Sequence, residues 1–341
     1  MNFRYDALPM RVVFGAGSLS RLPDEVGAIG LERILVLCGP RQEAVGKQVA
    51  EALGDRCVGV LPEARMHVPV EVAGRARAVA AELAADGCVA VGGGSAIGLG
   101  KAVALEHGLP VVAVPTTYAG SEMTPVWGLT EDGVKRTGRD RKVLPVSVVY
   151  DPALTLSMPV GLAVTSGVNA LAHAAEGLYA PDGSPIVALM AREGIRALTA
   201  ALPAIVAGPE DAQARADALY GAWLCGAVLG ATTMGLHHRL CHTLGGTLNL
   251  PHAETHTVVL PHVLAYNGGA VARELDGRSL WALEGELGAP RSLRELGMDA
   301  ADIDRVADLV AGATFPNPRP VTRSDVRDLL HAAWAGTPPP G

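Results

Sequence analysis

The first half of this 341-residue chain alternates short runs of apolar, largely β-branched residues with segments of helical length. The runs are continuously apolar over four to six residues, which is typical of parallel strands covered on both faces; they lie at 33–38, 57–61, 88–91 and 111–114. The amphipathic or Ala-rich segments between them lie at roughly 41–53, 70–85 and 96–107. This repeated strand–helix–strand order predicts a doubly wound α/β sheet.

The second half changes character after Asp151-Pro152, which ends a further apolar run at 143–152. Strand patterns nearly vanish there, and Ala/Leu-rich stretches of helical length follow one another at about 161–180, 184–203, 210–232, 234–247, 255–266, 269–288, 301–312 and 323–335. We therefore expect two domains, an α/β domain at 1–152 and an all-helical domain at 153–341.

Composition limits the partners and the environment of the chain. The net charge is −7, and no cluster of Lys and Arg has the density of a nucleic-acid surface, so no nucleic-acid partner is expected. No apolar run approaches the roughly eighteen residues of a membrane span, and the first residues lack the apolar stretch of a signal peptide. We expect a cytoplasmic protein without a membrane partner.

The five cysteines are odd in number and scattered along the chain, at Cys38, Cys57, Cys88, Cys225 and Cys241. Most of them lie within apolar runs. This distribution argues against a disulfide framework or a Cys-based zinc site, and it indicates core positions instead.

A glycine-rich loop follows the strand predicted at 88–91. The run Gly92-Gly93-Gly94-Ser95 lets backbone N–H groups approach a diphosphate, and the following helix adds a favourable dipole. A tight strand-to-helix turn would have the same composition, and the residues alone do not separate the two interpretations. The next strand ends in Thr116 and Thr117, with Ser121 shortly after, and these hydroxyls could also contact a dinucleotide at the carboxyl edge of the sheet. The G-x-G of residues 14–19 is expected to be an ordinary turn.

The end of the first predicted strand bears on cofactor choice. A dinucleotide enzyme usually places an acidic side chain there to bond the adenosine ribose and exclude a 2′-phosphate. Here Gly39, Pro40 and Arg41 follow the strand instead. Both NADH and NADPH therefore stay open as cofactors, with Gly39 and Pro40 as backbone contacts.

Histidines in two matched pairs of positions indicate a chemical site. His238 and His242 are four residues apart and share one face of a helix, and His252 follows a Leu-Pro break that could return the chain to the same place. His173 is likewise four residues after Asn169. Each histidine taken singly is more often an ordinary core or surface residue, but together they favour a common site. Imidazole and carboxylate are the usual ligands of Zn²⁺ or Fe²⁺, so an amide in place of the carboxylate is expected to weaken metal binding.

Longer segments of the chain resemble the maleylacetate reductases, which belong to the iron-containing alcohol dehydrogenase superfamily. The segments are GGGSAIGLGK, PTTYAGSEMTPVWGLTE, NALAHAAEGLYA, GLHHRLCHTLGG and NLPHAETHTVVLPHVLAYN, with MHVPVEVA upstream and FPNPRPVTRSDVRDLLHAAW near the end. The resemblance is highly specific and runs from Phe3 to about Trp334.

This resemblance implies the dehydroquinate synthase-like fold of the superfamily. It implies an N-terminal NAD(P)H-binding α/β domain, an all-α C-terminal domain, a cleft between the two, and a homodimer. The implied reaction is reduction of the carbon–carbon double bond of 2-maleylacetate, a small dicarboxylate, to 3-oxoadipate during the breakdown of aromatic compounds. NADH or NADPH would supply the hydride.

The resemblance also implies that a metal site has been lost. Metal-dependent members have Asp at the position of Asn169, and their other ligands match His173, His238 and His252. They commonly have a second Asp at the position of Gly98. We therefore expect no metal, and we interpret Asn169 with the three histidines as an ancestral site.

Reduction of an enone suits imidazole side chains. Hydride delivered to the carbon β to the ketone places charge on the ketone oxygen, and the resulting enolate must be protonated; histidine can stabilise that charge and return a proton near neutral pH. We assign His242 as proton donor and the remaining histidines, His173, His238 and His252, to the anion pocket. The candidates for substrate binding are Asn169, Arg139, Arg141, Lys142 and Arg319, although each basic residue is equally typical of a solvated surface.

One departure from the family pattern keeps alternatives open. The family often has a tyrosine just before the PNPRP stretch, and here the residue is Phe315. A relative that reduces another activated enone is one alternative, and a metal-dependent (Fe/Zn) alcohol dehydrogenase with Asn169 as a neutral ligand is another. A cyclase that uses NAD transiently and a non-catalytic dinucleotide sensor are two more. Metal content and net consumption of NADH would separate these classes.

Overall fold

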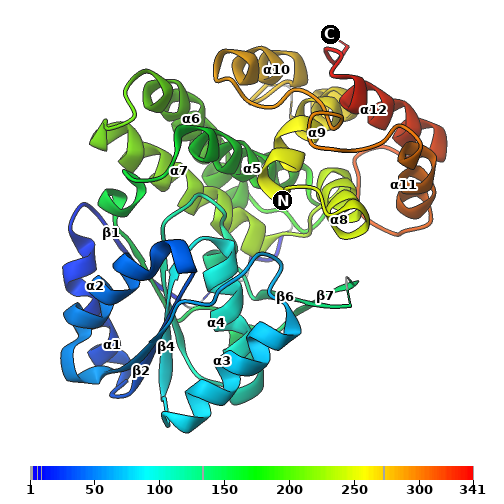
Figure 1. The fold of residues 1–341 in the computed structure, drawn as a ribbon. Helices are drawn as coiled ribbons and strands as arrows, with labels where there is room; N and C mark the ends of the chain where they lie inside the picture. The colour runs from blue at the N-terminus through cyan, green and yellow to red at the C-terminus, as the bar shows by residue number, and fades with distance from the viewer. Residues whose placement is uncertain (1–2, 6, 9, 133, 272, 341) are drawn as a thin grey trace. The chain divides into compact units, whose positions relative to one another are not determined.

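The computed structural model describes residues 3–5, 7–8, 10–132, 134–271 and 273–340. These residues form two compact units, Leu8–Met158 and Pro159–Gly341, the latter together with Met1–Ala7 (Figure 1). Each unit is described by itself.

The first unit is built on a parallel sheet of six strands in the order β1-β8-β5-β4-β2-β3. The strands are β1 (Arg11–Phe14), β2 (Ile34–Cys38), β3 (Cys57–Leu61), β4 (Gly87–Gly92), β5 (Val111–Pro115) and β8 (Ser147–Tyr150). Every residue of β2, β4, β5 and β8 is buried, as expected for strands covered on both faces. The predicted α/β sheet is confirmed.

Four helices cover the two faces of this sheet. They are α1 (Leu22–Ile29), α2 (Glu43–Leu53), α3 (Val70–Glu82) and α4 (Gly94–His107). Apolar residues of α1 and α2 pack with residues of β2, β4 and β5 in one core cluster, while α3 and α4 lie together on the opposite face (Figure 1).

The sheet has a topological switch point between β2 and β4. The chain leaves β2 toward β3 on one side and leaves β4 toward β5 on the other, although β2 and β4 are neighbours. In open α/β sheets, ligands bind outside the carboxyl ends of the strands at such a point. The loops after β2 and β4, which begin at Gly39 and Gly93, are therefore at the expected place for a dinucleotide.

Two features of this unit escaped the sequence prediction. The edge strand β1 was not predicted, and it precedes the turn at 14–19, whose Gly15 and Gly17 have φ of 146° and 75°. That region is a turn, as expected, and its Gly17 and Leu19 N–H groups donate to the Asp151 carboxylate at 3.1 Å each. An antiparallel hairpin of β6 (Val126–Glu131) and β7 (Val134–Arg139) was also missed; it pairs with no strand of the main sheet among the described residues.

The second unit is helical. Its helices are α5 (Val160–Tyr179), α6 (Pro185–Ala207), α7 (Ala212–Ala231), α8 (Leu236–Leu248), α9 (His252–Asn267), α10 (Gly277–Glu286), α11 (Asp302–Ala311) and α12 (Arg323–Ala335). These bounds match the sequence prediction closely except at α10, which was predicted at 269–288. Asp276 starts that helix late because its side chain accepts a hydrogen bond from the Ser279 N–H.

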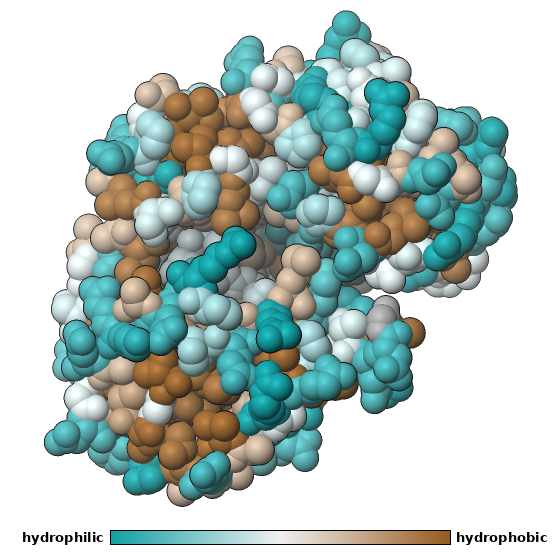
Figure 2. All heavy atoms as spheres, in the orientation of Figure 1, coloured by the Kyte–Doolittle hydropathy of each residue, from teal (hydrophilic) through white to brown (hydrophobic). Residues whose placement is uncertain are grey.

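Apolar residues form a core in the helical unit, and hydrophilic residues cover much of the visible surface. In the helical unit, one apolar cluster joins α8, α9, α11 and α12. Figure 2 shows hydrophilic residues spread over the visible face, with hydrophobic residues in separate patches between them. No single described helix is long and apolar enough to cross a membrane; α7 and α8 meet that test only as a pair, bent by 93°.

Candidate active site

The helical unit brings the four predicted histidines into one cluster. His173 comes from α5, His238 and His242 from α8, and His252 is the first residue of α9. The ring centroids of His173 and His238 are 5.0 Å apart, those of His238 and His242 5.8 Å, and those of His242 and His252 6.3 Å. The structure therefore brings these four side chains together from three helices.

Asn169 lies one turn before His173 on α5, and its side chain is buried. Its Oδ1, the Nδ1 of His173 and the Nε2 of His238 are buried and find no hydrogen-bond partner among the described residues. Leaving such atoms unpaired costs about 1–3 kcal/mol each, so a polar ligand that pairs with them would be stabilised.

A buried carboxylate that the sequence prediction missed orients this cluster. Glu176, on α5, accepts hydrogen bonds from the N–H groups of Gly235 at 3.0 Å and His237 at 2.8 Å, and from the Tyr179 hydroxyl at 3.1 Å. His238 Nδ1 also lies 2.7 Å from its Oε2. Burial opposes ionisation of Glu176, but the hydrogen bond and charge of His238 outweigh burial and lower its pKa to about 2.

The ionised Glu176 fixes one proton of His238. Because the carboxylate can only accept, His238 Nδ1 is protonated, and Nε2 is the ring nitrogen left for a ligand. The signal in the sequence was weak: Glu176 is three residues after His173, but its partners on α8 lie about sixty residues away.

His256, also missed, lies deepest in the cluster. Its ring centroid is 4.3 Å from that of His252 and 5.0 Å from that of His238, and its side chain is 0% exposed. The available signal was its position four residues after His252, which repeats the helical pairing of the other histidines. His237, which its place beside His238 marks as structural, is also fully buried, and its Nε2 lies 3.0 Å from the His256 carbonyl oxygen.

Burial sets the protonation of the inner histidines. Burial, followed by the charges of neighbouring histidines, lowers the pKa of His173 and of His256 well below the usual range. These rings are therefore neutral near pH 7 and act through N–H and lone pairs rather than as cations. His242 is exposed and His252 half-buried, so the cluster runs from solvent to a dry interior.

In the α/β unit, the predicted phosphate loop has the backbone geometry of a cradle. Gly92 ends β4 with φ of 142°, and a Cβ there would lie 2.3 Å from Gln42 Oε1; at Gly93 it would lie 2.9 Å from Thr117 Oγ1. Helix α4 starts at Gly94, so the first N–H groups of the helix, including that of Ser95, point out of its N-terminus. Glycine is required at both positions for the loop to keep this shape, and the N–H groups at the start of α4 fit a dinucleotide diphosphate.

Thr116 and Gly39 extend this edge of the sheet. The Gln42 side-chain amide donates to Thr116 Oγ1 at 2.5 Å, which links the loop after β2 to the end of β5. Gly39 lies beneath Ala64, whose carbonyl oxygen would be 3.6 Å from a Cβ at that position. Pro40 begins a short 3₁₀ helix directly after it.

Lys101 holds the next loop by its backbone. Lys101 is 1% exposed, and its ammonium group donates to the carbonyl oxygens of Ser121 at 2.6 Å, Thr124 at 2.7 Å and Val126 at 2.8 Å. Burial lowers the pKa of Lys101 to about 7, against the charge of Glu122. The segment that carries Ser121 is therefore fixed in place from inside the unit.

Three of the predicted carboxylate-binding residues belong to the other unit. Arg139, Arg141 and Lys142 lie in the α/β unit, at the end of β7 and in the 3₁₀ helix after it, and all three are exposed. Arg319 belongs to the helical unit, where it stacks 4.0 Å over the Tyr266 ring and donates to the Tyr266 carbonyl oxygen at 3.0 Å.

Arg319 is therefore held at the far end of α9. Tyr266 is ten residues after His256 on that helix, which corresponds to about 15 Å along its axis. Phe315, where the family often has tyrosine, packs against the apolar cluster of α8, α9, α11 and α12.

Gly98, on the first turns of α4, has little room for a larger side chain because Val68 lies against it. A Cβ there would lie 2.7 Å from Val68 Cγ2, so a larger side chain requires Val68 to move. Val68 itself has φ of 48°, a strained conformation for a β-branched residue. The loop that carries it is bonded to β6 through Thr130, which donates from its N–H to the Val68 carbonyl oxygen at 3.1 Å.

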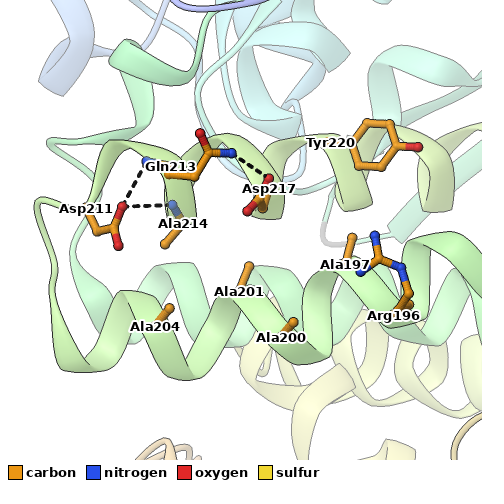
Figure 3. Close-up of a pocket in the computed structure, with 10 residues that line it drawn as sticks. All are labelled: Arg196, Ala197, Ala200, Ala201, Ala204, Asp211, Gln213, Ala214, Asp217 and Tyr220. Carbon is orange, nitrogen blue, oxygen red and sulfur yellow. Dashed lines mark hydrogen bonds between the residues drawn. The ribbon is translucent and has the colours of Figure 1, made fainter.

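The helical unit also contains a cavity of about 280 Å³ between α6 and α7 (Figure 3). Alanines of α6 line much of it, and its polar groups are already engaged: Gln213 donates to Asp217, and Asp211 caps α7. No residue of the histidine cluster lines it. It is a groove left by small side chains and does not carry the chemistry.

Comparisons with known proteins agree with this geometry. The family described as "Iron-containing alcohol dehydrogenase" matches residues 9–152, and "Fe-containing alcohol dehydrogenase family, C-terminal" matches residues 163–278. The chain is 55% identical to a maleylacetate reductase of Burkholderia cepacia and 54% identical to one of Sphingobium indicum, over 99% of each chain in both cases. The crystal structure of maleylacetate reductase from Agrobacterium tumefaciens superposes with a TM-score of 0.96 at 48% identity, covering 99% of this chain and 100% of that one.

Proposed function

Because the chain belongs to the maleylacetate reductases of the iron-containing alcohol dehydrogenase family, we propose that it reduces the carbon–carbon double bond of 2-maleylacetate to 3-oxoadipate. NADH or NADPH, held at the glycine loop of the α/β unit, supplies the hydride. The observation that carries the proposal is the histidine cluster ordered by Glu176.

The histidines serve the two needs of this reaction. Hydride arriving at the carbon β to the ketone makes an enolate, whose oxygen must be stabilised and whose α carbon must take one proton. Neutral His173, together with His238 and the Asn169 amide, offers polar atoms to the charged substrate, and His242 at the exposed side returns the proton. A proton from solvent then restores His242.

The geometry supports a reaction without a catalytic metal. Within the described parts of the chain, His173, His238 and His252 do not form a group whose ligand atoms all lie within 4.8 Å of one another. Asn169 adds no charge, and the nearby carboxylate of Glu176 is occupied by N–H donors. A divalent ion there would have no anionic protein ligand, so these residues should bind one weakly.

The remaining assignments are proposed with the same function. Gly39, Pro40, Gly92, Gly93, Gly94, Ser95, Thr116, Thr117 and Ser121 bind the dinucleotide, and Arg139, Arg141, Lys142 and Arg319 are candidates for the substrate carboxylates. The absence of a carboxylate among residues 39–42 supports use of both NADH and NADPH. We further propose domain limits of 1–152 and 153–341, a homodimer and a cytoplasmic location.

An assay of reduced nicotinamide tests the proposal. Purified protein, dialysed against a chelator, should oxidise NADH or NADPH in proportion to added maleylacetate, with 3-oxoadipate as product. A cyclase would leave the cofactor pool unchanged, and a sensor would bind NADH without turnover. Either result would reject the proposal.

The unpaired atoms of Asn169, His173 and His238 favour one rival, a metal-dependent alcohol dehydrogenase. That enzyme would lose its activity with the chelator and regain it with Zn²⁺ or Fe²⁺. It would also oxidise simple alcohols, which the proposed reductase should not.

A further inference from the structure

A second set of metal-binding side chains lies behind the histidines discussed so far. His237 and Cys241 are one turn apart on α8, and His256 faces them from α9; one ligand atom from each lies within 4.8 Å of the other two. The three side chains are 0%, 1% and 0% exposed, respectively. The scattered cysteines gave no hint of this group, because its partners are histidines rather than further cysteines.

The spacing of two of these ligand atoms already suits zinc. Cys241 Sγ lies 3.6 Å from His237 Nε2. With Zn–S of about 2.3 Å and Zn–N of about 2.1 Å in tetrahedral geometry, the two ligand atoms would be roughly 3.6 Å apart. An ion there requires the His256 ring to approach this pair, His237 Nε2 to leave the His256 carbonyl oxygen at 3.0 Å, and a fourth ligand to complete the tetrahedral set.

Three ring nitrogens of His237 and His256 are buried without a hydrogen-bond partner among the described residues. Both ring nitrogens of His256 and the Nδ1 of His237 are buried, and the structure gives them no hydrogen-bond partner within its described ranges. Buried polar atoms are normally paired, and each exception calls for an explanation such as an ion. His237 Nε2, the nitrogen nearest Cys241 Sγ, already lies 3.0 Å from the His256 carbonyl oxygen, so an ion at Nε2 would replace that contact, whereas neither His256 nitrogen is engaged.

The charges would balance without help from solvent. A dication bound by one thiolate leaves a single positive charge, and the Glu176 carboxylate lies beside it, in a group with His237 and His238 whose ligand atoms are also within 4.8 Å. Binding would release one proton from the Cys241 thiol to solvent. A buried ion is tolerated when its charge is neutralised in this way.

We propose that His237, Cys241 and His256 form a structural zinc site, separate from Asn169, His173, His238 and His252. The ion would tie α8 to α9 and fix the backbone from which His238 and His252 project. Since the separate set contains only nitrogen and oxygen donors, sulfur coordination distinguishes the two. Zinc found in the purified protein would then be no sign of a catalytic metal.

Cobalt substitution tests the site in the full-length protein. After chelator treatment and dialysis with Co²⁺, the parent should bind about one equivalent and show a thiolate-to-cobalt charge-transfer band, which Zn²⁺ abolishes on addition. Cys241→Ser should lose the band. The matched control Cys225→Ser removes a thiol that is equally buried, on α7, and should keep it. His173→Ala should keep it as well.

Each outcome decides the proposal. A parent protein without the band, a band that survives Cys241→Ser, or a band lost with His173→Ala would overturn it. The parent measurement holds even if a variant does not fold. Reduction of maleylacetate by the same chelated protein is read separately, so failure of the zinc site and failure of the proposed function give different results.

Discussion

Two buried glutamates of the helical unit should respond oppositely to the same substitution. Glu176 and Glu284 are each 1% exposed, yet Glu176 accepts hydrogen bonds from several donors and Glu284 has no partner for either oxygen in the part of the chain that the structure describes. Burial raises the pKa of Glu284 well above its usual range, with only Arg291 opposing. We expect Glu176→Gln to destabilise the unit and Glu284→Gln to stabilise it at pH 7.

The magnitude for Glu176 follows from linkage. Its pKa falls from an ordinary value of 4.5 to about 2 on folding, which corresponds to about 3 kcal/mol of stability at roughly 1.4 kcal/mol per pH unit. Because the folded pKa is the lower one, this stability is present above pH 4.5 and is lost as the pH falls toward 2. For Glu284 the folded pKa is the higher one, so the benefit of Gln should grow as the pH rises above 4.5.

Urea unfolding of chelator-dialysed protein at several pH values between 7 and 4 provides the assay. Tryptophan fluorescence reports mainly on the helical unit, since Trp223, Trp281 and Trp334 lie there. A Glu176→Gln variant within about 1 kcal/mol of the parent at every pH would refute the role given to this carboxylate. Equal destabilisation by both substitutions would show that any change at a buried glutamate has the same effect, and would refute the argument from hydrogen bonding.

Three further substitutions test the two parts of the site. His242→Ala should lower kcat about 10² to 10⁴-fold while the Kd for NADH, measured by fluorescence titration, stays nearly constant; unchanged turnover would remove His242 from the mechanism. Asn169→Asp should bind one more equivalent of Zn²⁺ than the parent in equilibrium dialysis without faster alkene reduction, and equal metal content would contradict an ancestral site. Gly92→Ala should weaken NADH binding, because its Cβ would lie 2.3 Å from Gln42 Oε1, whereas Gly74→Ala, with nothing within 4 Å, should not; equal NADH affinity in the two variants would count against the cradle.

The sequence predicted the elements whose burial produces a regular pattern of apolar residues. The strands β2, β4 and β5 are buried throughout, so their apolar runs were continuous. The strand β7 (Val134–Arg139) is largely exposed and pairs with β6, so the run VKRTGR gave no such trace. Helix pairing likewise revealed His238 and His242, because both lie on one element.

Contacts between distant segments were beyond that kind of reasoning. Glu176 acts through N–H groups of α8, and only the folded unit shows that those groups converge on it. Arg319 was a reasonable candidate for a carboxylate partner as an isolated cation, but stacking on Tyr266 is a tertiary contact that its sequence neighbours do not reveal. The sequence showed which side chains could bind or react, but it did not show which residues each of them would contact.

The hydrogen bonds from Lys101 to three main-chain carbonyl oxygens have a consequence for evolution. Carbonyl oxygens are the same whatever residue bears them, so these three bonds do not depend on the side chains of the segment from Ser121 to Val126; Lys101 also donates to the hydroxyls of Ser121 at 3.4 Å and Thr124 at 2.9 Å. Two positions of the stretch are still constrained, because the Thr124 hydroxyl accepts from Lys101 and the buried Glu122 accepts from the Tyr150 hydroxyl at 2.8 Å. Directed libraries aimed at new cofactor or substrate preference should therefore spare these two residues and the lysine, and vary the others.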